Sequence, residues 1–284
     1  MNVHVIILSK DKIEILFQCL NSIYSKTTFP DYYVWVADTG TNNDLKKEIQ
    51  IRLDEFNCKY NYENKGFKKQ YKTYNFLEFN FYHFSKNNNE VVKYLENNKI
   101  IVETDLLLFC NNDIQLIDDC ISGCVNTYNY LSNNNVNVGT LGIRLHFPDN
   151  TIQHCGLDII LKGNRIRISH KDYRYSKGFL EDTRECIGVT GAFLLTSYKV
   201  FLSIGRLNEN YIEGYQDIEF NLECIRKGYK NYMLGQFAAY HYESLTRNEN
   251  KDKRLNESFD FSTNLFPYII KHYRKFRYLF TIIE

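Results

Sequence analysis

The chain has 284 residues, enough for one large domain or two small ones, and its 44% hydrophobic and 24% charged residues exclude a disordered or fibrous protein. Its 35 lysines and arginines almost balance 34 acidic residues, which argues against a nucleic-acid binder, because such proteins carry a marked basic excess. Eight scattered cysteines without a C-x-x-C pair are typical of free thiols in a reducing compartment.

The first part of the chain alternates between strand and helix patterns. The apolar run at residues 3–8 predicts a buried strand, and apolar residues at helical spacing predict a helix over 13–25. A second strand is predicted over 33–37 and a second helix over 45–56. This order indicates an α/β fold in which helices cover a parallel sheet.

The rest of the chain continues the alternation. Strands are predicted at 106–110 and 138–145 around a helix at 118–131. Further strands of a smaller second sheet are expected at 152–161, a loop at 165–185, helices at 197–204 and 217–227, and short strands at 229–233 and 237–240. Since no linker or repeat interrupts this pattern, we expect a single domain over residues 1–262.

The two ends of the chain bear on location. The run at 3–8 is too short for a secretory signal, and no segment approaches 18 apolar residues, so a cytoplasmic location is expected. Residues 263–284 carry Lys271, Arg274, Lys275 and Arg277 among aromatic side chains. They predict a basic-aromatic helix, either packed on the domain, which we favour, or peripheral at a membrane surface.

Polar residues follow three of the predicted strands. Ser9 follows the first, Asp38 the second, and Asn111 to Asp113 follow the strand at 106–110. Parallel sheets bind ligands at the carboxyl ends of their strands. A divalent cation that bridges a phosphorylated ligand would balance converging carboxylates. The alternative is that these residues only form and cap turns.

Eight segments in the same order resemble the family 2 glycosyltransferases, and more narrowly their rhamnosyltransferase-like branch. They are VHVIILSKDKIEILFQCLNSIYS, YYVWVADTGTNND, FNFYHFSKNNNEVVKY, DLLLFCNNDIQL, FPDNTIQHCGLDI, VTGAFLLTSYKVF, YIEGYQDIEFNLECIRKGYKN and AYHYESLTR. The resemblance covers most of the chain. It implies a GT-A fold with a mostly parallel central sheet, flanking helices and a smaller second sheet.

The resemblance also implies a metal site and a donor site. Asp113 and His241 would bind Mn²⁺ or Mg²⁺, which would bridge the diphosphate of a nucleotide sugar. Asn111 stands where the family has the first aspartate of its DXD motif, and it would contact the ribose or a metal-bound water.

Four further residues would contact the donor. Asp38 would bind the base or ribose, with Ser9 at the neighbouring strand end. Gly191 would let the backbone approach the sugar, although a strand bulge is the alternative. Arg247 would pair with the diphosphate, although a solvated loop arginine is the alternative.

The resemblance implies that Asp217 is the general base that takes the proton of the acceptor hydroxyl, although helix capping is an alternative role. Glu219 replaces the second aspartate of the same family motif. His154 and His170 match family positions, but the sequence leaves their role open.

These residues predict a metal-dependent inverting glycosyltransferase of the hexosyltransferase class. It would move a sugar from a nucleoside-diphosphate donor, for which a UDP type is favoured, to a hydroxyl of a glycan or glycoconjugate. The alternative is a non-catalytic nucleotide-sugar or glycan-binding module, because Asn111 and Glu219 depart from the family pattern. A sugar nucleotidyltransferase is disfavoured, since SKDKIEI lacks a glycine-rich loop.

Overall fold

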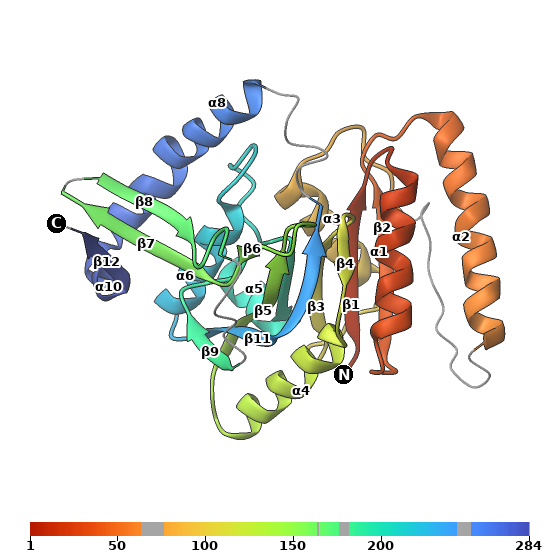
Figure 1. Ribbon diagram of the computed structural model, residues 1–284, viewed down its shortest axis with the longest axis horizontal. Helices are drawn as coiled ribbons and strands as arrows, with labels where there is room; N and C mark the ends of the chain where they lie inside the picture. The colour runs from red at the N-terminus through yellow and green to blue at the C-terminus, as the bar shows by residue number, and fades with distance from the viewer. Residues whose placement is uncertain (64–76, 164, 176–181, 243–250, 284) are drawn as a thin grey trace.

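The computed structural model describes residues 1–63, 77–163, 165–175, 182–242 and 251–283. Among these residues a central sheet contains nine strands (Figure 1). They are β1 (Val3–Ser9), β2 (Tyr32–Asp38), β3 (Leu106–Asn111), β4 (Ile114–Leu116), β5 (Val138–His146), β6 (Ile152–His154), β9 (Thr183–Cys186), β10 (Phe193–Ser197) and β11 (Lys230–His241). The order is β2-β1-β3-β10-β5-β11-β4, with β6 beside β5 and β9 beside β11.

The long strands share one direction, with one exception. Strand β1 is parallel to β2 and β3, and β11 is parallel to β5. Strand β10 lies between β3 and β5 and is antiparallel to both. The carboxyl ends of β1, β2, β3, β5 and β11 therefore meet the beginning of β10 at one edge of the sheet, which we call the carboxyl edge.

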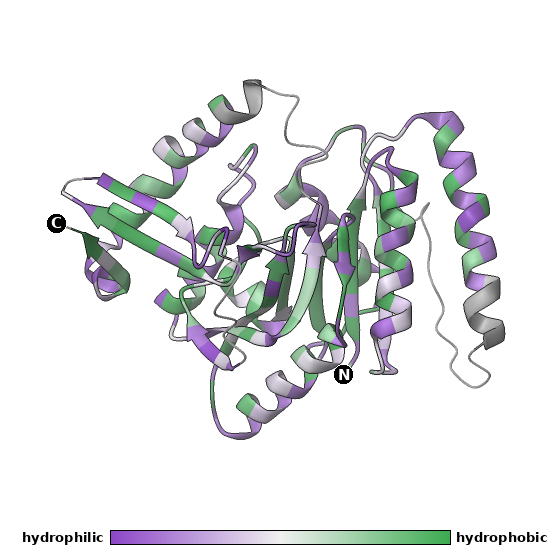
Figure 2. Cartoon of the chain, viewed as in Figure 1, coloured by the Kyte–Doolittle hydropathy of each residue, from purple (hydrophilic) through white to green (hydrophobic). Residues whose placement is uncertain are grey.

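Helices cover both faces of this sheet, as the alternation of patterns predicts. Helices α1 (Ile13–Lys26), α2 (Asn43–Glu63) and α4 (Cys120–Asn133) pack on one face, and α3 (Phe84–Asn97), α5 (Tyr198–Ile204) and α6 (Gln216–Arg226) pack on the other. In β1 the residues Val3, Val5 and Ile7 face the first layer, and Ile6 and Leu8 face the second. A strand buried on both faces must be apolar throughout, and Figure 2 shows the central strands as predominantly hydrophobic.

A smaller second sheet has the order β12-β7-β8 and lies at one end of the molecule (Figure 1). Its strands are β7 (Leu157–Lys162), β8 (Arg165–His170) and β12 (Phe280–Ile283). The loop predicted at 165–185 is wrong at both of its ends, because β8 and β9 form there. Exposed Arg165 and Arg167 alternate in β8 with half-buried Ile166 and Ile168, which is the period of a half-buried strand.

The C-terminal segment is not the single helix that we predicted. After α8 (Lys251–Asp260), the chain forms η1 (Phe261–Leu265), α9 (Phe266–Lys271), α10 (Tyr273–Phe276), η2 (Arg277–Leu279) and then β12. The side chains of Leu265, Ile269 and Phe276 are fully buried against α6 and β7. The last residues pair with β7 as a strand instead of continuing the helix. No helix in the described ranges is long and apolar enough to cross a membrane.

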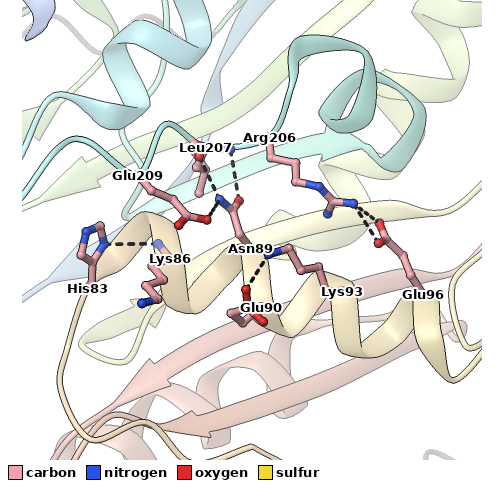
Figure 3. Close-up of polar contacts among 9 residues, drawn as sticks. All are labelled: His83, Lys86, Asn89, Glu90, Lys93, Glu96, Arg206, Leu207 and Glu209. Carbon is pink, nitrogen blue, oxygen red and sulfur yellow. Dashed lines mark hydrogen bonds and ion pairs between the residues drawn. The ribbon is translucent and has the colours of Figure 1, made fainter.

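Polar contacts fix α3 to the segment that leads toward α6 (Figure 3). The Asn89 amide is buried; it donates to the Leu207 carbonyl and to Glu209 Oε1 at 2.8 Å each, and its oxygen accepts the Leu207 N–H at 3.2 Å. Arg206 donates to both oxygens of Glu96. These contacts restrict the loop that leads into α6. Asp217 lies in the first turn of that helix.

Candidate active site

The carboxyl edge brings together residues that are far apart in the sequence. Ser9 and Asp38 end neighbouring strands and are register partners. Asn111 ends β3 on the other side of β1. His241 ends β11 opposite the first residue of β4, and Asp113 directly precedes β4. The predicted polar residues of these strand ends therefore share one edge.

His241 and Asp113 form the predicted metal pair. The Asp113 Oδ1 atom lies 3.2 Å from His241 Nε2, and the Asn111 amide nitrogen lies 3.3 Å from the same ring nitrogen. On the other side of the ring, Nδ1 lies 2.5 Å from the Gln153 oxygen. Because an amide oxygen only accepts, Nδ1 carries a proton and donates it to Gln153. The Nε2 atom is thereby directed at the Asp113 carboxylate.

This pair fits a divalent cation that is bound together with a donor. The buried Asp113 Oδ1 accepts no hydrogen bond in the part of the chain that is described, and the His241 Nε2 that faces it carries no proton. An imidazole nitrogen and a carboxylate oxygen suit Mn²⁺, and Gln153 orients the ring as outer partners of metal-binding histidines do. No cluster of three or more His, Cys, Asp or Glu occurs among the described residues, so diphosphate oxygens would have to complete the coordination.

Asp38 is buried and already balanced by a cation. Its Oδ1 accepts the Thr41 N–H at 3.0 Å, and its Oδ2 lies 3.0 Å from Lys46 Nζ, which also contacts Glu78. Burial alone would raise the pKa of Asp38, but the bonds from Thr41 and Lys46 outweigh it, so the pKa is lowered. The neighbouring Ser9 hydroxyl accepts from the Asn112 amide at 3.4 Å. Asp38 is therefore held ionised at the carboxyl edge.

Asp217 lies in the first turn of α6 and contacts the loop before β10, which contains Gly191, the residue predicted to approach the donor sugar. Its Oδ2 accepts the Gly191 N–H at 2.7 Å, and its Oδ1 accepts the Ile218 N–H at 2.9 Å. Burial raises the pKa of Asp217, although these two N–H groups act in the opposite direction. Asn111 N–H donates to the Ala192 carbonyl at 2.9 Å, so the loop that holds Asp217 also contacts the strand end beside His241.

Gly191 is required by packing at this place. A Cβ atom there would lie 2.9 Å from the Phe84 ring and 3.3 Å from the Asp217 Cβ. Glu219, by contrast, accepts from the Asn208 amide and from the Tyr211 hydroxyl, so it stabilises the preceding loop. Arg247, predicted to pair with the diphosphate, lies outside the described residues.

Comparison with known proteins identifies the fold. No protein-family model matches the chain. It is 28% identical over 155 residues to the O-antigen biosynthesis protein RfbC of Myxococcus xanthus, and 32% identical over 117 residues to the uncharacterized protein y4gI of Sinorhizobium fredii. These matches cover 50% and 39% of this chain, but only 11% and 12% of the relatives.

Solved structures resemble most of the chain. GalNAc-T7 with UDP, GalNAc and Mn²⁺ has a TM-score of 0.54 at 12% identity, over 85% of this chain and 43% of that one. The mannosyltransferase PcManGT of Pyrobaculum calidifontis, with GDP-Man and Mn²⁺, has a TM-score of 0.55 at 10% identity, over 90% and 60%. TarS of S. aureus has a TM-score of 0.53 at 12% identity, over 85% and 37%. The chain has the GT-A glycosyltransferase fold.

This GT-A fold contains residues near the site that the sequence did not single out. Lys46 balances Asp38, Gln153 orients His241, and Asp260 holds the loop before Asp217. Gln153 had a local signal, because it precedes His154 in a segment that resembles the family. Lys46 and Asp260 had no local signal, because Asp38 lies on another element and the loop at 212–214 is remote from Asp260 in the sequence.

Asp260 anchors the loop that precedes Asp217. This carboxylate, at the end of α8, is fully buried. Its oxygens accept the backbone N–H groups of Ile212, Glu213 and Gly214 at 3.0, 2.6 and 3.1 Å. Helix α8 therefore stabilises the loop at residues 212–214, which precedes the candidate base.

We expect Asp260→Ala to lower the free energy of unfolding by about 3 kcal/mol, because three backbone N–H groups lose the buried carboxylate that accepts them. Urea unfolding measures this loss. Asp54→Ala, at an exposed aspartate of α2, is the control and should change the stability by less than about 0.5 kcal/mol. Equal stability of the two variants would contradict the anchoring role.

A cavity of about 710 Å³ lies between α3, the 204–209 segment, α6 and the C-terminal helices. None of the predicted site residues lines it. Its Lys93, Arg206 and Arg226 are paired with Glu90, Glu96 and Glu223. We therefore assign the candidate active site to the carboxyl edge and not to this cavity.

Proposed function

We propose that this chain is an inverting, metal-dependent glycosyltransferase. It moves a hexosyl group from a nucleoside-diphosphate sugar to a hydroxyl of a glycan or glycoconjugate. The observation that carries the proposal is the convergence of Asp113, His241 and Asp217 at the carboxyl edge of a GT-A fold. Neighbours described with UDP, UDP-GlcNAc and GDP-Man support a nucleotide-sugar donor, and a UDP type remains favoured. The name of RfbC supports a glycan acceptor.

Asp217 has the environment that a general base needs. As the acceptor oxygen bonds to the anomeric carbon and the bond to the diphosphate breaks, the hydroxyl proton passes to Asp217. The Gly191 N–H fixes the orientation of the carboxylate, and burial keeps its proton affinity above that of an exposed aspartate. A divalent ion held by Asp113 and His241 would neutralise charge on the departing diphosphate.

We expect a matching nucleotide sugar with Mn²⁺ to raise the melting temperature by about 5 °C at a hundredfold excess over its dissociation constant. A thermal-shift screen of UDP-, GDP- and dTDP-sugars, each with Mn²⁺, with Mg²⁺ or with EDTA, measures this. Product analysis with the stabilising donor and a set of glycan acceptors follows. If no donor stabilises the protein under any condition, the proposed function is wrong.

The competing function is a binding module without turnover. The observation that favours it is the neutral Asn111 in the place of the first aspartate of the DXD motif, because it removes one negative charge from the cation site. Such a module would be stabilised by a donor but would neither transfer nor hydrolyse it. Detection of free nucleoside diphosphate above the rate without protein decides against this alternative.

We also propose that the C-terminal segment meets an anionic membrane from the cytoplasmic side. Lys271, Arg274, Lys275 and Arg277 are exposed and have no carboxylate partner among the described residues. No acidic residue lies between positions 261 and 283. Exposed apolar side chains accompany them, with Tyr278 at 70% and Ile282 at 73%. Cations interleaved with such side chains suit the interface of an anionic bilayer.

We expect the double variant Lys275→Gln/Arg277→Gln to bind anionic vesicles roughly 30-fold more weakly, since each basic residue near the surface contributes about 1 kcal/mol. Co-sedimentation with phosphatidylglycerol vesicles measures the change. Lys26→Gln/Lys47→Gln, at exposed lysines of α1 and α2, is the matched control. Wild-type protein that sediments equally with neutral phosphatidylcholine vesicles would refute this contact.

A further inference from the structure

His154, whose role the sequence leaves open, is buried directly beside the loop that holds the candidate base. It is the last residue of β6, and its side chain is 1% exposed. The preceding residue is Gln153, which orients His241. Two successive residues of β6 thus contact the candidate active site: Gln153 contacts His241, and His154 contacts the loop that meets Asp217. Strand β6 pairs with the end of β5 and so lies at the carboxyl edge (Figure 1).

The hydrogen bonds of His154 define its tautomer. Its Nε2 accepts the Thr190 N–H at 3.2 Å, so Nε2 carries no proton. Its Nδ1 lies 2.6 Å from the Nδ1 of His170, and the proton of that contact resides on His154. Burial, followed by the charges of His170, His241 and Arg184, holds the pKa of His154 well below its usual range. The ring is therefore neutral and presents a fixed acceptor to the Thr190 peptide.

The Thr190 N–H belongs to the Val189–Thr190 peptide, and the next peptide, Thr190–Gly191, contacts the candidate base. The next N–H along the chain, that of Gly191, donates to Asp217 Oδ2 at 2.7 Å, and the Thr190 hydroxyl also bonds to Asp217. The Asn221 side chain fixes the preceding residue, Val189, by accepting its N–H and donating to its carbonyl. Without His154, the Thr190 N–H would lose its acceptor, and this turn would then be held by its hydrogen bonds to Asp217 and Asn221.

We propose that His154 is a positioning residue, whose Nε2 holds the Val189–Thr190 peptide so that the N–H of the next peptide, that of Gly191, meets the Asp217 carboxylate. The proposal rests on the proposed function for its effect on turnover. The hydrogen bond itself does not depend on that function. His154 does not touch the reacting atoms and acts through Gly191.

A pair of variants isolates the acceptor atom. The terminal oxygen of glutamine reaches about as far as imidazole Nε2, whereas that of asparagine reaches only as far as Nδ1. We expect His154→Asn to lower kcat at least tenfold with the donor KM within twofold of wild type, and His154→Gln to retain at least a third of kcat. His170→Asn, at the exposed partner, should stay within threefold of wild type.

The acid limb of the pH profile provides a readout that simple destabilisation would not move. Loss of the Gly191 N–H bond removes a contact that stabilises ionised Asp217, so the limb in His154→Asn should shift to higher pH. The groups acting on Asp217 are Gly191, Ile218 and Thr190, and none of them titrates in this range. Equal loss of kcat in the Asn and Gln variants, or an unmoved limb, would overturn the positioning role.

A measurement without substrate separates this proposal from the proposed function. In long-range ¹H–¹⁵N spectra of the wild-type protein we expect His154 as the Nδ1–H tautomer. We also expect a downfield Gly191 amide proton that moves upfield in His154→Asn. An Nε2–H tautomer would refute the proposal even if His154→Asn failed to fold. Wild-type protein that transfers no sugar, yet has this tautomer and this amide shift, would refute the proposed function and leave the contact established.

Discussion

Replacement of Asp217 by asparagine is expected to lower kcat about 10²–10⁴-fold, the usual contribution of a general base, and to leave donor affinity unchanged. The asparagine oxygen can still accept the Gly191 N–H, so the turn keeps its geometry while the acceptor for the proton is lost. Initial rates with the donor found by thermal shift, together with calorimetric donor binding, measure the two effects.

A base at Asp217 also predicts how the activity of the wild-type protein changes with pH. A base works only when it is ionised, so kcat/KM should rise with pH through the pKa of Asp217. Burial raises this pKa above that of an ordinary aspartate, and the limb should lie correspondingly higher. The limb should be absent from the residual activity of Asp217→Asn.

The matched control for Asp217 is Glu219→Gln on the same helix. Glu219 accepts from Asn208 and Tyr211 through different oxygens; in glutamine the oxygen can still accept from the Asn208 amide and the NH2 group can donate to the Tyr211 hydroxyl oxygen, so activity should stay within a few-fold of wild type. If Glu219→Gln reduces kcat as severely as Asp217→Asn, Asp217 has no special role as the base. Undiminished transfer by Asp217→Asn would lead to the same conclusion.

The second large effect concerns the metal pair. Asp113→Asn and His241→Ala should each lower Mn²⁺-stimulated activity at least a hundredfold, because the first removes the charge of one proposed ligand and the second removes the other proposed ligand, 3.2 Å away. Gln153→Ala should weaken Mn²⁺ binding about 10- to 100-fold without removing a ligand. Calorimetric titration of Mn²⁺ in the presence of the nucleoside diphosphate ranks the three variants.

Two controls match the residue types of this pair. His272 precedes α10, and Asp44 is exposed in the first turn of α2, so both residues lie outside the metal pair. His272→Asn and Asp44→Asn should therefore keep the metal response of wild type. Full activity after EDTA treatment and gel filtration would contradict a metal role for Asp113 and His241. Recovery of activity on adding back Mn²⁺ or Mg²⁺ would identify the ion that the site uses.

Much of the fold could be predicted because its signals are local. The strand at 3–8 is an uninterrupted apolar run because β1 is buried on both faces. Polar residues are the last residues of β1, β2 and β3, and parallel strands bring their ends to the same edge. The convergence of Ser9, Asp38 and Asn111 follows from this geometry.

Some errors of the sequence prediction have local causes and some do not. The segment of β8 was predicted to be a loop because it is polar, although arginine and isoleucine alternate there at the strand period. Strand β12 could not be recognised as a strand in isolation, because its neighbour β7 lies more than a hundred residues earlier in the chain. The basic residues among aromatic side chains at 263–284 gave no local sign that the segment breaks into short helices and a strand.

Local sequence patterns indicated most of the strands and helices and the residue types from which we propose a nucleotide-sugar and metal site. Only the tertiary structure decided which side chains meet: Lys46 with Asp38, Gln153 with His241, Asp260 with the loop before Asp217, and His154 with Thr190. The physical reason is that hydrophobic periodicity depends on neighbours along the chain. Hydrogen-bond partners depend on sheet order and register, which are set when the whole core packs.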